Sequence, residues 1–496
     1  MVVASATFLA SMAAAQDRPL QIVSPWEITG LDPARSGFVF GRLQIAETLV
    51  GADESGRPAP AIAREWSASE DGLRWRFVLR PGARFHDGTP IDPASVATAL
   101  NRARANPASM LANAPIAAIE PDGGALIVRL ERPFPALPAF FAHSSGIVLA
   151  PSAFDASGAV RQIIASGPYR ATLVEPPLRV EAERVSPDTP VARIAYLAVP
   201  RGETRAAMAE SGQADIVYLL PPESVERLKR NARIDVSVHP VPRTRMLKLN
   251  AAPPFFDDAR AREAVSLAID RDGIAHALLR SPEAAATQMF PPGMAEWHLP
   301  GLPKLAHDPA RANALLDALG WRRGSDGVRV KDGRRFSVQL RTFADRPEQP
   351  PMAAAIQAQL KDVGIEVAVA IMNSGEIPAG HRDGTLQMAL LARNFALVPD
   401  PLGTLLQDYG PRGGDWGAMN WSNAGLARAI DGLAAGPDAA TRARLRGEIA
   451  TILRAELPTI PIAWFDMAVG VNKRVTGVVV DPFELSYHVT KMRWAR

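Results

Sequence analysis

Cysteine is absent from the 496 residues of this chain. Its absence excludes disulfides, thiolate nucleophiles, cysteine metal sites and a lipid anchor on an N-terminal cysteine. Long apolar runs are missing too, because no segment after the N-terminal region approaches the roughly 18 apolar residues of a membrane-spanning helix. Neither sign of charge is in excess, since 55 Lys and Arg face 52 Asp and Glu. With no basic cluster interleaved with aromatic residues, we expect no nucleic-acid partner.

Signatures of catalysis and metal binding are also missing. The sequence contains no G-x-S-x-G elbow, no H-E-x-x-H, no Walker loop and no G-x-G-x-x-G. None of the eight histidines shares a helix with another at the i, i+4 spacing of a metal site. We therefore expect no catalytic residue, no metal site and no cofactor.

The N-terminus carries a short apolar run over residues 2–15. It ends in Ala13-Ala14-Ala15, the small-residue pattern of a signal-peptide cleavage site, and polar sequence begins at Gln16. No Lys or Arg precedes the run, so a buried N-terminal helix is the alternative interpretation. We predict that residues 1–15 are a signal peptide and that the protein is periplasmic, soluble and without a lipid anchor.

The remaining sequence predicts an α/β protein of several domains. A chain of this length exceeds what one hydrophobic core supports, so on the order of two to four domains are expected. In residues 73–80, large apolar side chains alternate with Arg74, Arg76, Val78 and Arg80, which indicates a strand with one solvent-exposed face. Asp92-Pro93 predicts a helix start, and residues 193–220 read as strand, helix and strand. Apolar spacing predicts further helices over 259–269, 309–319, 352–360 and 445–453.

Eight segments of the chain stand in a characteristic order. The first four are AREWSASEDGLRWRFVLRPGARFHDGTPIDPASV (63–96), ASGPYR (165–170), ESGQADIVY (210–218) and LNAAPPFFDDARAREAVSLAIDRDGI (249–274). With FPPGMAEWHLPGLPKLAHDPARANALLDALGW, AIQAQLKDVGIEVAV, VPDPLGTLL and AELPTIPI, they resemble extracellular solute-binding protein family 5. These are the substrate-binding proteins of the dipeptide, oligopeptide and nickel ABC importers.

The resemblance implies a fold like the type II periplasmic binding proteins: a clam shell of two lobes with an extra inserted domain. The implied domains are a composite domain I (16–45, 168–243 and 466–496), an inserted domain II (46–167) and a domain III (244–465) that forms the second lobe. The implied function is capture of a small solute between the lobes and its delivery to the membrane permease. We expect a monomer whose partners are the solute and the permease.

The resemblance also implies where the solute binds. In the first lobe, the segment SPWEITGLDPARSGFVF resembles the family's pocket-edge loop. In the second lobe, aromatic and polar residues gather in loop-like, glycine-rich sequence, although such aromatic residues also occur in cores. The predicted ligand-binding residues are Trp26, Phe38, Phe40, Arg393, Phe395, Asp400, Trp416, Asn420 and Trp421. Asp400 is predicted to anchor a cationic group, and the alternative is that it caps a helix whose first residue is Pro401.

The identity of the solute stays open between several classes. A short peptide or a related amino-acid-derived compound is the main interpretation. ATQMFPPG, GVRVKDGRRFSV and PRGETRAAM are similar to the nickel and metallophore branch, so a metal chelate is the alternative. The chain lacks that branch's histidine after the D-P element and its arginine near His143, which argues against direct nickel binding. An exported hydrolase without a recognised motif is the alternative from a different class, and it would show turnover.

Overall fold

A computed structural model describes residues 18–53, 56–396, 401–410 and 413–495 of the chain. A mixed ten-stranded sheet runs through both lobes in the order β17-β16-β18-β12-β19-β11-β1-β10-β9-β8. Its strands are β1 (Leu20–Ser24), β8 (Tyr169–Glu175), β9 (Arg179–Arg184), β10 (Arg193–Ala198), β11 (Ile216–Tyr218), β12 (Ile234–Leu249), β16 (Ser337–Phe343), β17 (Glu366–Met372), β18 (Met388–Asn394) and β19 (Thr459–Asn472).

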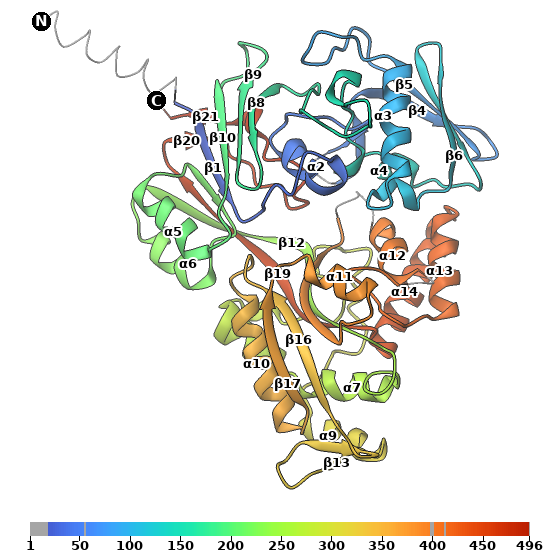
Figure 1. Ribbon diagram of the computed structural model, residues 1–496, viewed down its shortest axis with the longest axis vertical. Helices are drawn as coiled ribbons and strands as arrows, with labels where there is room; N and C mark the ends of the chain where they lie inside the picture. The colour runs from blue at the N-terminus through green and yellow to red at the C-terminus, as the bar shows by residue number, and fades with distance from the viewer. Residues whose placement is uncertain (1–17, 54–55, 397–400, 411–412, 496) are drawn as a thin grey trace, which may run out of the picture.

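Two long antiparallel strands, β12 and β19, join the lobes (Figure 1). The first half of β12 pairs only with β19, and the C-terminal end of β19 pairs in turn with β11. The second half of β12, from Arg243 to Leu249, pairs with β18 on one side and β19 on the other. The register of the β12–β19 pair shifts between Val241 and Thr244 and again between Arg245 and Met246. Irregular pairing bends a strand locally. The chain therefore crosses between the lobes at an irregular point of an otherwise continuous sheet.

The first lobe contains the predicted strand, helix and strand. They are β10, α5 (Gly202–Ser211) and β11, and both strands run parallel to β1 between them. Helix α2 (Pro33–Arg42) begins at Asp32, whose side chain accepts a hydrogen bond from the backbone N–H of Ala34. The C-terminal segment returns to this lobe, where residues 477–488 form neither helix nor strand.

The inserted unit is a separate sheet with one long helix. The strands β4 (Ala63–Ala68), β5 (Arg74–Leu79), β7 (Ala125–Leu130) and β6 (Ile116–Asp122) form it in that order. Strand β5 alternates exposed arginines with buried Trp75, Phe77 and Leu79, as its sequence predicts. Helix α3 (Pro93–Ala105) begins at Asp92, which accepts from the backbone N–H of Ser95. The predicted helix start at Asp92-Pro93 is confirmed.

The second lobe carries most of the helices. Asp258 caps α7 and Asp308 caps α9, as the helix spacing predicts. After Asp270 the chain forms a second, short helix, because the Asp270 side chain accepts from Gly273 N and caps α8. The helices are α7 (Ala259–Ala268), α8 (Arg271–Ile274), α9 (Pro309–Ala318), α10 (Gln349–Asp362), α11 (Glu376–Arg382), α12 (Leu402–Tyr409), α13 (Ala424–Ala434) and α14 (Ala439–Glu456).

The two lobes are in contact in this structure. The inserted unit lies over α12, α13 and α14 (Figure 1), and one apolar cluster holds buried residues from both, including Leu111 and Phe141 on one side and Leu402 and Leu405 on the other. Arg132 lies 3.9 Å from Asp431 across the same contact. The described conformation is therefore closed. None of its described helices is both long and apolar enough for a bilayer crossing.

Candidate solute-binding site

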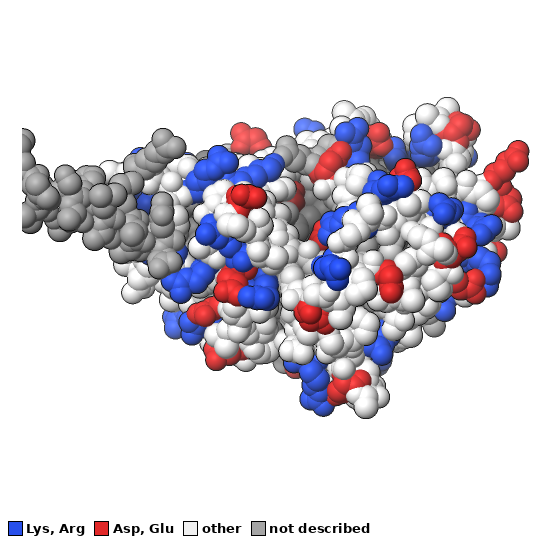
Figure 2. All heavy atoms as spheres, turned by 90° about the horizontal axis from the view of Figure 1, so that it is seen from above, with Lys and Arg blue, Asp and Glu red and all other residues white. Residues whose placement is uncertain are grey.

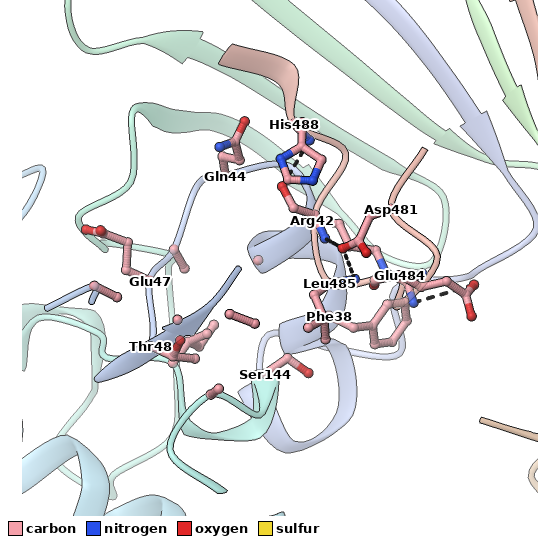
Figure 3. Close-up of a pocket in the computed structure, with 18 of the residues that line it drawn as sticks. Phe38, Arg42, Gln44, Glu47, Thr48, Ser144, Asp481, Glu484, Leu485 and His488 are labelled. Atoms are coloured by element: carbon pink, nitrogen blue, oxygen red, sulfur yellow. Dashed lines mark hydrogen bonds and ion pairs between the residues drawn. The ribbon is translucent and has the colours of Figure 1, made fainter. Parts of the chain in front are cut away.

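A pocket lies where α2, the inserted unit and the C-terminal segment 481–488 meet. Its volume is about 230 Å³. Figure 3 shows Arg42, Asp481 and Glu484 gathered at one wall, with Glu47 and Thr48 of the inserted unit across from them. Asp481 is used locally, because its carboxylate accepts hydrogen bonds from three backbone N–H groups, those of residues 483, 485 and 486. The polar groups that stay unsatisfied are those of Arg42 and Glu484.

Arg42 is fixed in place by two aromatic rings. Its guanidinium carbon lies 4.3 Å from the ring centre of Trp26 and 5.2 Å from that of Phe38, within cation–π range. Its Nε donates to the backbone carbonyl of Glu484 at 2.6 Å. The residue is only 4% exposed, and its Nη1 has no hydrogen-bond partner. The site therefore holds a rigid cation with a free donor.

Glu484 connects the two lobes. One oxygen of its carboxylate, Oε2, accepts from Arg243 of β12 and, at 2.9 Å, from Asn394 of β18. The other oxygen, Oε1, has no hydrogen bond and lies 3.9 Å from Nη2 of Arg42. A buried charge with a missing hydrogen bond costs about 1 to 3 kcal/mol or more. This carboxylate is half satisfied at the junction of the lobes.

Three arginines surround Phe465, which lies on β19 at the crossing between the lobes. Their guanidinium carbons lie 4.9, 4.0 and 5.5 Å from its ring centre, for Arg243, Arg245 and Arg346 in that order. Arg245 is paired, because its Nε lies 2.9 Å from Glu348. By contrast, Arg243 keeps two unpartnered nitrogens, Nε and Nη1, and Arg346 keeps one, Nη1.

The local electrostatics reflect this crowding. Burial lowers the pKa of Arg243 to about 9; Glu484 opposes that fall, and the nearby Arg346 and Arg42 add to it. Burial also raises the pKa of Asp345, whose Oδ1 is buried without a hydrogen bond. Buried charges are normally paired and hydrogen-bonded. The buried atoms of Arg42, Arg243, Arg346, Asp345 and Glu484 that lack a hydrogen bond therefore mark this cluster as a candidate site for a bound ligand.

A second polar group lies in the second lobe, built around Arg393. Its guanidinium pairs with both oxygens of Asp408, which is fully buried, and its Nη2 donates to Gln407 at 2.7 Å. Burial raises the pKa of Asp408, and the Arg393 charge opposes that rise. His143 of the inserted unit is near the same charge: burial, and then Arg393, lower its pKa to about 4. The guanidinium of Arg393 is therefore already used inside the protein.

The glycine-rich segment before Trp416 packs closely on α12. A β-carbon on Gly414 would lie 2.3 Å from the carbonyl oxygen of Gln407. Lys248 of β12 also anchors the segment, because its Nζ donates hydrogen bonds to the carbonyl oxygens of Gly414 at 2.6 Å and Asp415 at 3.1 Å. Burial lowers the pKa of Lys248 to about 7. Gly414 and Asp415 are thus fixed in position against α12 and β12.

The predicted site residues fall into two groups. Trp26 and Phe38 hold Arg42, and Phe38 lines the pocket, whereas Phe40 is fully buried in the core of the first lobe. Of the predicted residues in the second lobe, Phe395 is buried and stacks edge-on with Phe290 at 5.1 Å.

Three further residues predicted in the second lobe, Trp416, Asn420 and Trp421, are half-buried or exposed. Trp416 and Trp421 are half-buried against the shared apolar cluster. Asn420 is exposed and donates to Asn250 at 2.7 Å. Asp400 lies outside the described residues. Glu484 links the two lobes here, because it contacts Arg42 and also Asn394, which lies between Arg393 and Phe395 in the sequence.

The sequence interpretation did not single out Arg42, Arg243, Arg346 or Glu484. One signal was present: Arg243, Arg245 and Lys248 interrupt an otherwise apolar strand, PVPRTRMLKL, which is unusual for a strand buried on both faces. Glu484 carries no comparable signal, because it reaches the site from an irregular segment more than 400 residues after Arg42.

Two lobes joined by crossing strands, with unsatisfied polar groups from both at the junction, define the class: a solute-binding receptor with the type II periplasmic binding protein fold. NikA from Staphylococcus aureus, solved with Ni(L-His)2, superposes with a TM-score of 0.84, at 19% identity and over 96% of this chain and 100% of that one. The oligopeptide-binding protein AppA from Bacillus subtilis, solved with a nonapeptide, gives 0.84 at 17% identity, over 97% of this chain and 99% of that one. At these identities the likeness is one of fold.

The sequence comparisons assign the family. The model of the bacterial extracellular solute-binding proteins, family 5, matches residues 57–416. The nickel-binding periplasmic protein of Escherichia coli is 26% identical, over 94% of this chain and 93% of that protein. This chain belongs to the bacterial extracellular solute-binding proteins of family 5, the substrate-binding components of ABC importers.

Proposed function

We propose that this protein captures a short peptide, or a related amino-acid-derived compound, between its lobes in the periplasm and delivers it to an ABC permease as a monomer. One observation carries the proposal: unsatisfied donors and acceptors from both lobes converge at the lobe junction, beside a pocket that α2, the inserted unit and the C-terminal segment line. Solute pockets combine an apolar body with a few fixed polar groups of this kind. The proposal includes export through residues 1–15 and no enzymatic turnover.

We also propose the domain division expected from the sequence: 16–45, 168–243 and 466–496 as domain I, 46–167 as domain II and 244–465 as domain III. The register shifts of the β12–β19 pair support it, because they fall beside residues 243 and 466, where the division crosses these strands. Closing the lobes would then bend the chain at a point that is already irregular.

For the ligand contacts we propose one surface on each lobe. Trp26 and Phe38 act through Arg42 in the first lobe, and Trp416, Asn420 and Trp421 provide the facing surface in the second. The fully buried side chains of Phe40 and Phe395, together with Arg393, support those surfaces from behind. Asp400 remains our candidate for an anchor of a cationic group.

Metal-chelate binding is the second candidate, favoured by the match along nearly the full length of the nickel-binding periplasmic protein. In that case the solute is the chelate. Among the described residues no three His, Asp or Glu side chains come together as a metal site.

The experiment is a ligand screen with two independent readouts. Protein purified from its own host is examined by native mass spectrometry, and the stripped protein is then offered dipeptides, glutathione and Ni(L-His)2 in a thermal-shift assay. The proposal predicts a non-covalent small-molecule adduct and a raised unfolding temperature with at least one compound, because a ligand that binds only the native state stabilises it. Conversion of a compound to product, or no adduct and no shift with any compound, would contradict it.

A further inference from the structure

The cluster at the lobe junction has donors in excess of acceptors. It contains the guanidinium groups of Arg42, Arg243, Arg245 and Arg346 and the carboxylates of Asp345, Glu348 and Glu484. Within this set Arg245 and Glu348 satisfy each other at 2.9 Å. Arg42, Arg243 and Arg346 all keep at least one buried nitrogen with no hydrogen-bond partner. Arg42 and Arg243 are only 4% and 3% exposed.

These donors come from different parts of the molecule. Arg42 ends α2 in the first lobe, Arg243 lies on β12 at the crossing, and Arg346 follows β16 in the second lobe. A single anion placed among them would contact both lobes at once. Guanidinium groups match a carboxylate geometrically, because their paired N–H groups fit its two oxygens.

Glu484 now occupies the place that such an anion would take. It comes from an irregular segment rather than from a helix or strand, so it can move without breaking regular structure. Its hold is incomplete, because only Oε2 is hydrogen-bonded and Oε1 is not. It also lines the pocket of about 230 Å³ together with Arg42, so a solute in that pocket lies directly beside it.

We propose that the lobe junction is a carboxylate-binding subsite in which Arg42, Arg243 and Arg346 receive a carboxylate of the solute, and that Glu484 occupies this subsite until the solute displaces it. The inference rests on the proposed function and narrows its ligand class to acids. It also makes Glu484 a competitor of the solute, whereas a purely structural Glu484 would stabilise the closed, ligand-bound form.

The test compares each compound with a matched neutral derivative. Dipeptides, glutathione and Ni(L-His)2 are titrated by calorimetry beside forms whose carboxylates are amides or esters. Losing one partner of a desolvated charge pair should weaken binding at least about 30-fold. This comparison uses the wild-type protein, so it does not depend on any variant folding.

The variant Glu484→Gln gives the more specific test, since glutamine keeps the size and shape of the side chain and removes the competing charge. The variant should bind the acid form about tenfold or more tightly than wild type, because two like charges no longer compete for the same cations. Its affinity for the neutral form should not change. The control is Arg329→Gln, which removes a fully buried arginine bonded to Val363 and Trp321 in the second lobe and should leave affinity unchanged.

The outcomes separate this inference from the proposed function. A neutral form that binds as tightly as its acid, or a Glu484→Gln variant that binds the acid no more tightly than wild type, overturns the subsite while the receptor function stands. Failure of every compound in both forms contradicts the proposed ligand class and the subsite together. Weaker binding of the neutral forms, combined with tighter binding of acids by Glu484→Gln, establishes the subsite.

Discussion

At the scale of single residues, the ion pair between Arg393 and Asp408 is buried and lies outside the pocket. Asp408→Ala leaves a nearly buried guanidinium without its carboxylate, so the free energy of unfolding should fall by about 3 to 5 kcal/mol. Replacing both partners, as in Arg393→Met with Asp408→Leu, should recover much of that loss. Urea unfolding measures both values.

The control for this pair is an exposed one. Lys229 and Glu226 lie 2.9 Å apart on the surface of α6 (Pro222–Lys229), where an ion pair is worth about 0 to 1 kcal/mol. Lys229→Ala should therefore change the unfolding free energy little. Equal losses in Asp408→Ala and Lys229→Ala would show that the buried pair has no special weight.

Lys248 makes stability depend on pH in a direction that can be worked out. Its pKa falls from about 10.4 in the unfolded chain to about 7 in the folded protein because it is buried. Between these values the unfolded state binds more protons, so stability should rise with pH across this window. Lys248→Met removes this contribution.

The measurement is urea unfolding of wild type and Lys248→Met at pH 7, 8 and 9. The stability of wild type relative to the variant should increase step by step as the pH rises, since the cost of burying the charge disappears. A constant or falling difference would mean that Lys248 stays charged in the folded protein, held by the carbonyls of Gly414 and Asp415.

At the scale of elements, the glycine-rich loop on α12 is set by close backbone contact. A β-carbon at Gly417 would lie 2.3 Å from the carbonyl oxygen of Asp408, closer than any real contact. Gly417→Ala should therefore displace the loop, lower the melting temperature and weaken solute binding. Gly301→Ala is the matched control, because a β-carbon there meets nothing within 4 Å. Equal melting temperatures for the two variants would contradict a tightly packed loop.

The elements themselves were largely predictable from the sequence. Strand β5 and the starts of α3, α7 and α9 follow from alternation and from aspartate caps, which are local signals. What could not be predicted is which side chains meet across the lobes. Glu484 reaches Arg42 and Arg243 from positions hundreds of residues away, and no local pattern encodes that contact.

The site residues also divide into what local sequence predicts and what only tertiary contacts show. Trp26 and Phe38 were predicted to bind the solute, yet the sequence could not show that both rings hold Arg42, which lines the pocket. Arg393 was predicted to bind the solute, and the sequence could not show that its guanidinium also bonds Asp408 and Gln407. A charged residue in a cleft region can serve the ligand or another side chain, and only the tertiary contacts distinguish the two.

At the scale of the whole molecule, the net charge is small, because 55 Lys and Arg are balanced by 52 Asp and Glu. Figure 2 shows both signs interspersed over the visible face, without a continuous patch of either. We expect calorimetry with Ni²⁺ alone to be flat to high micromolar concentration, because a bare ion needs several donors at coordination distance and the described residues provide no such group. Submicromolar affinity for the bare ion would contradict this expectation.

The central claim is that solute shifts the protein between an open and a closed arrangement of its lobes, because the binding groups come from both. A ligand can move this equilibrium only through its differential affinity for the two states. Small-angle X-ray scattering tests the claim most directly, on ligand-stripped protein with and without a saturating concentration of the dipeptide, glutathione or Ni(L-His)2 that raises its melting temperature. We predict a smaller radius of gyration with the compound, approaching the value calculated from the closed structure. An unchanged radius at saturation would contradict the account.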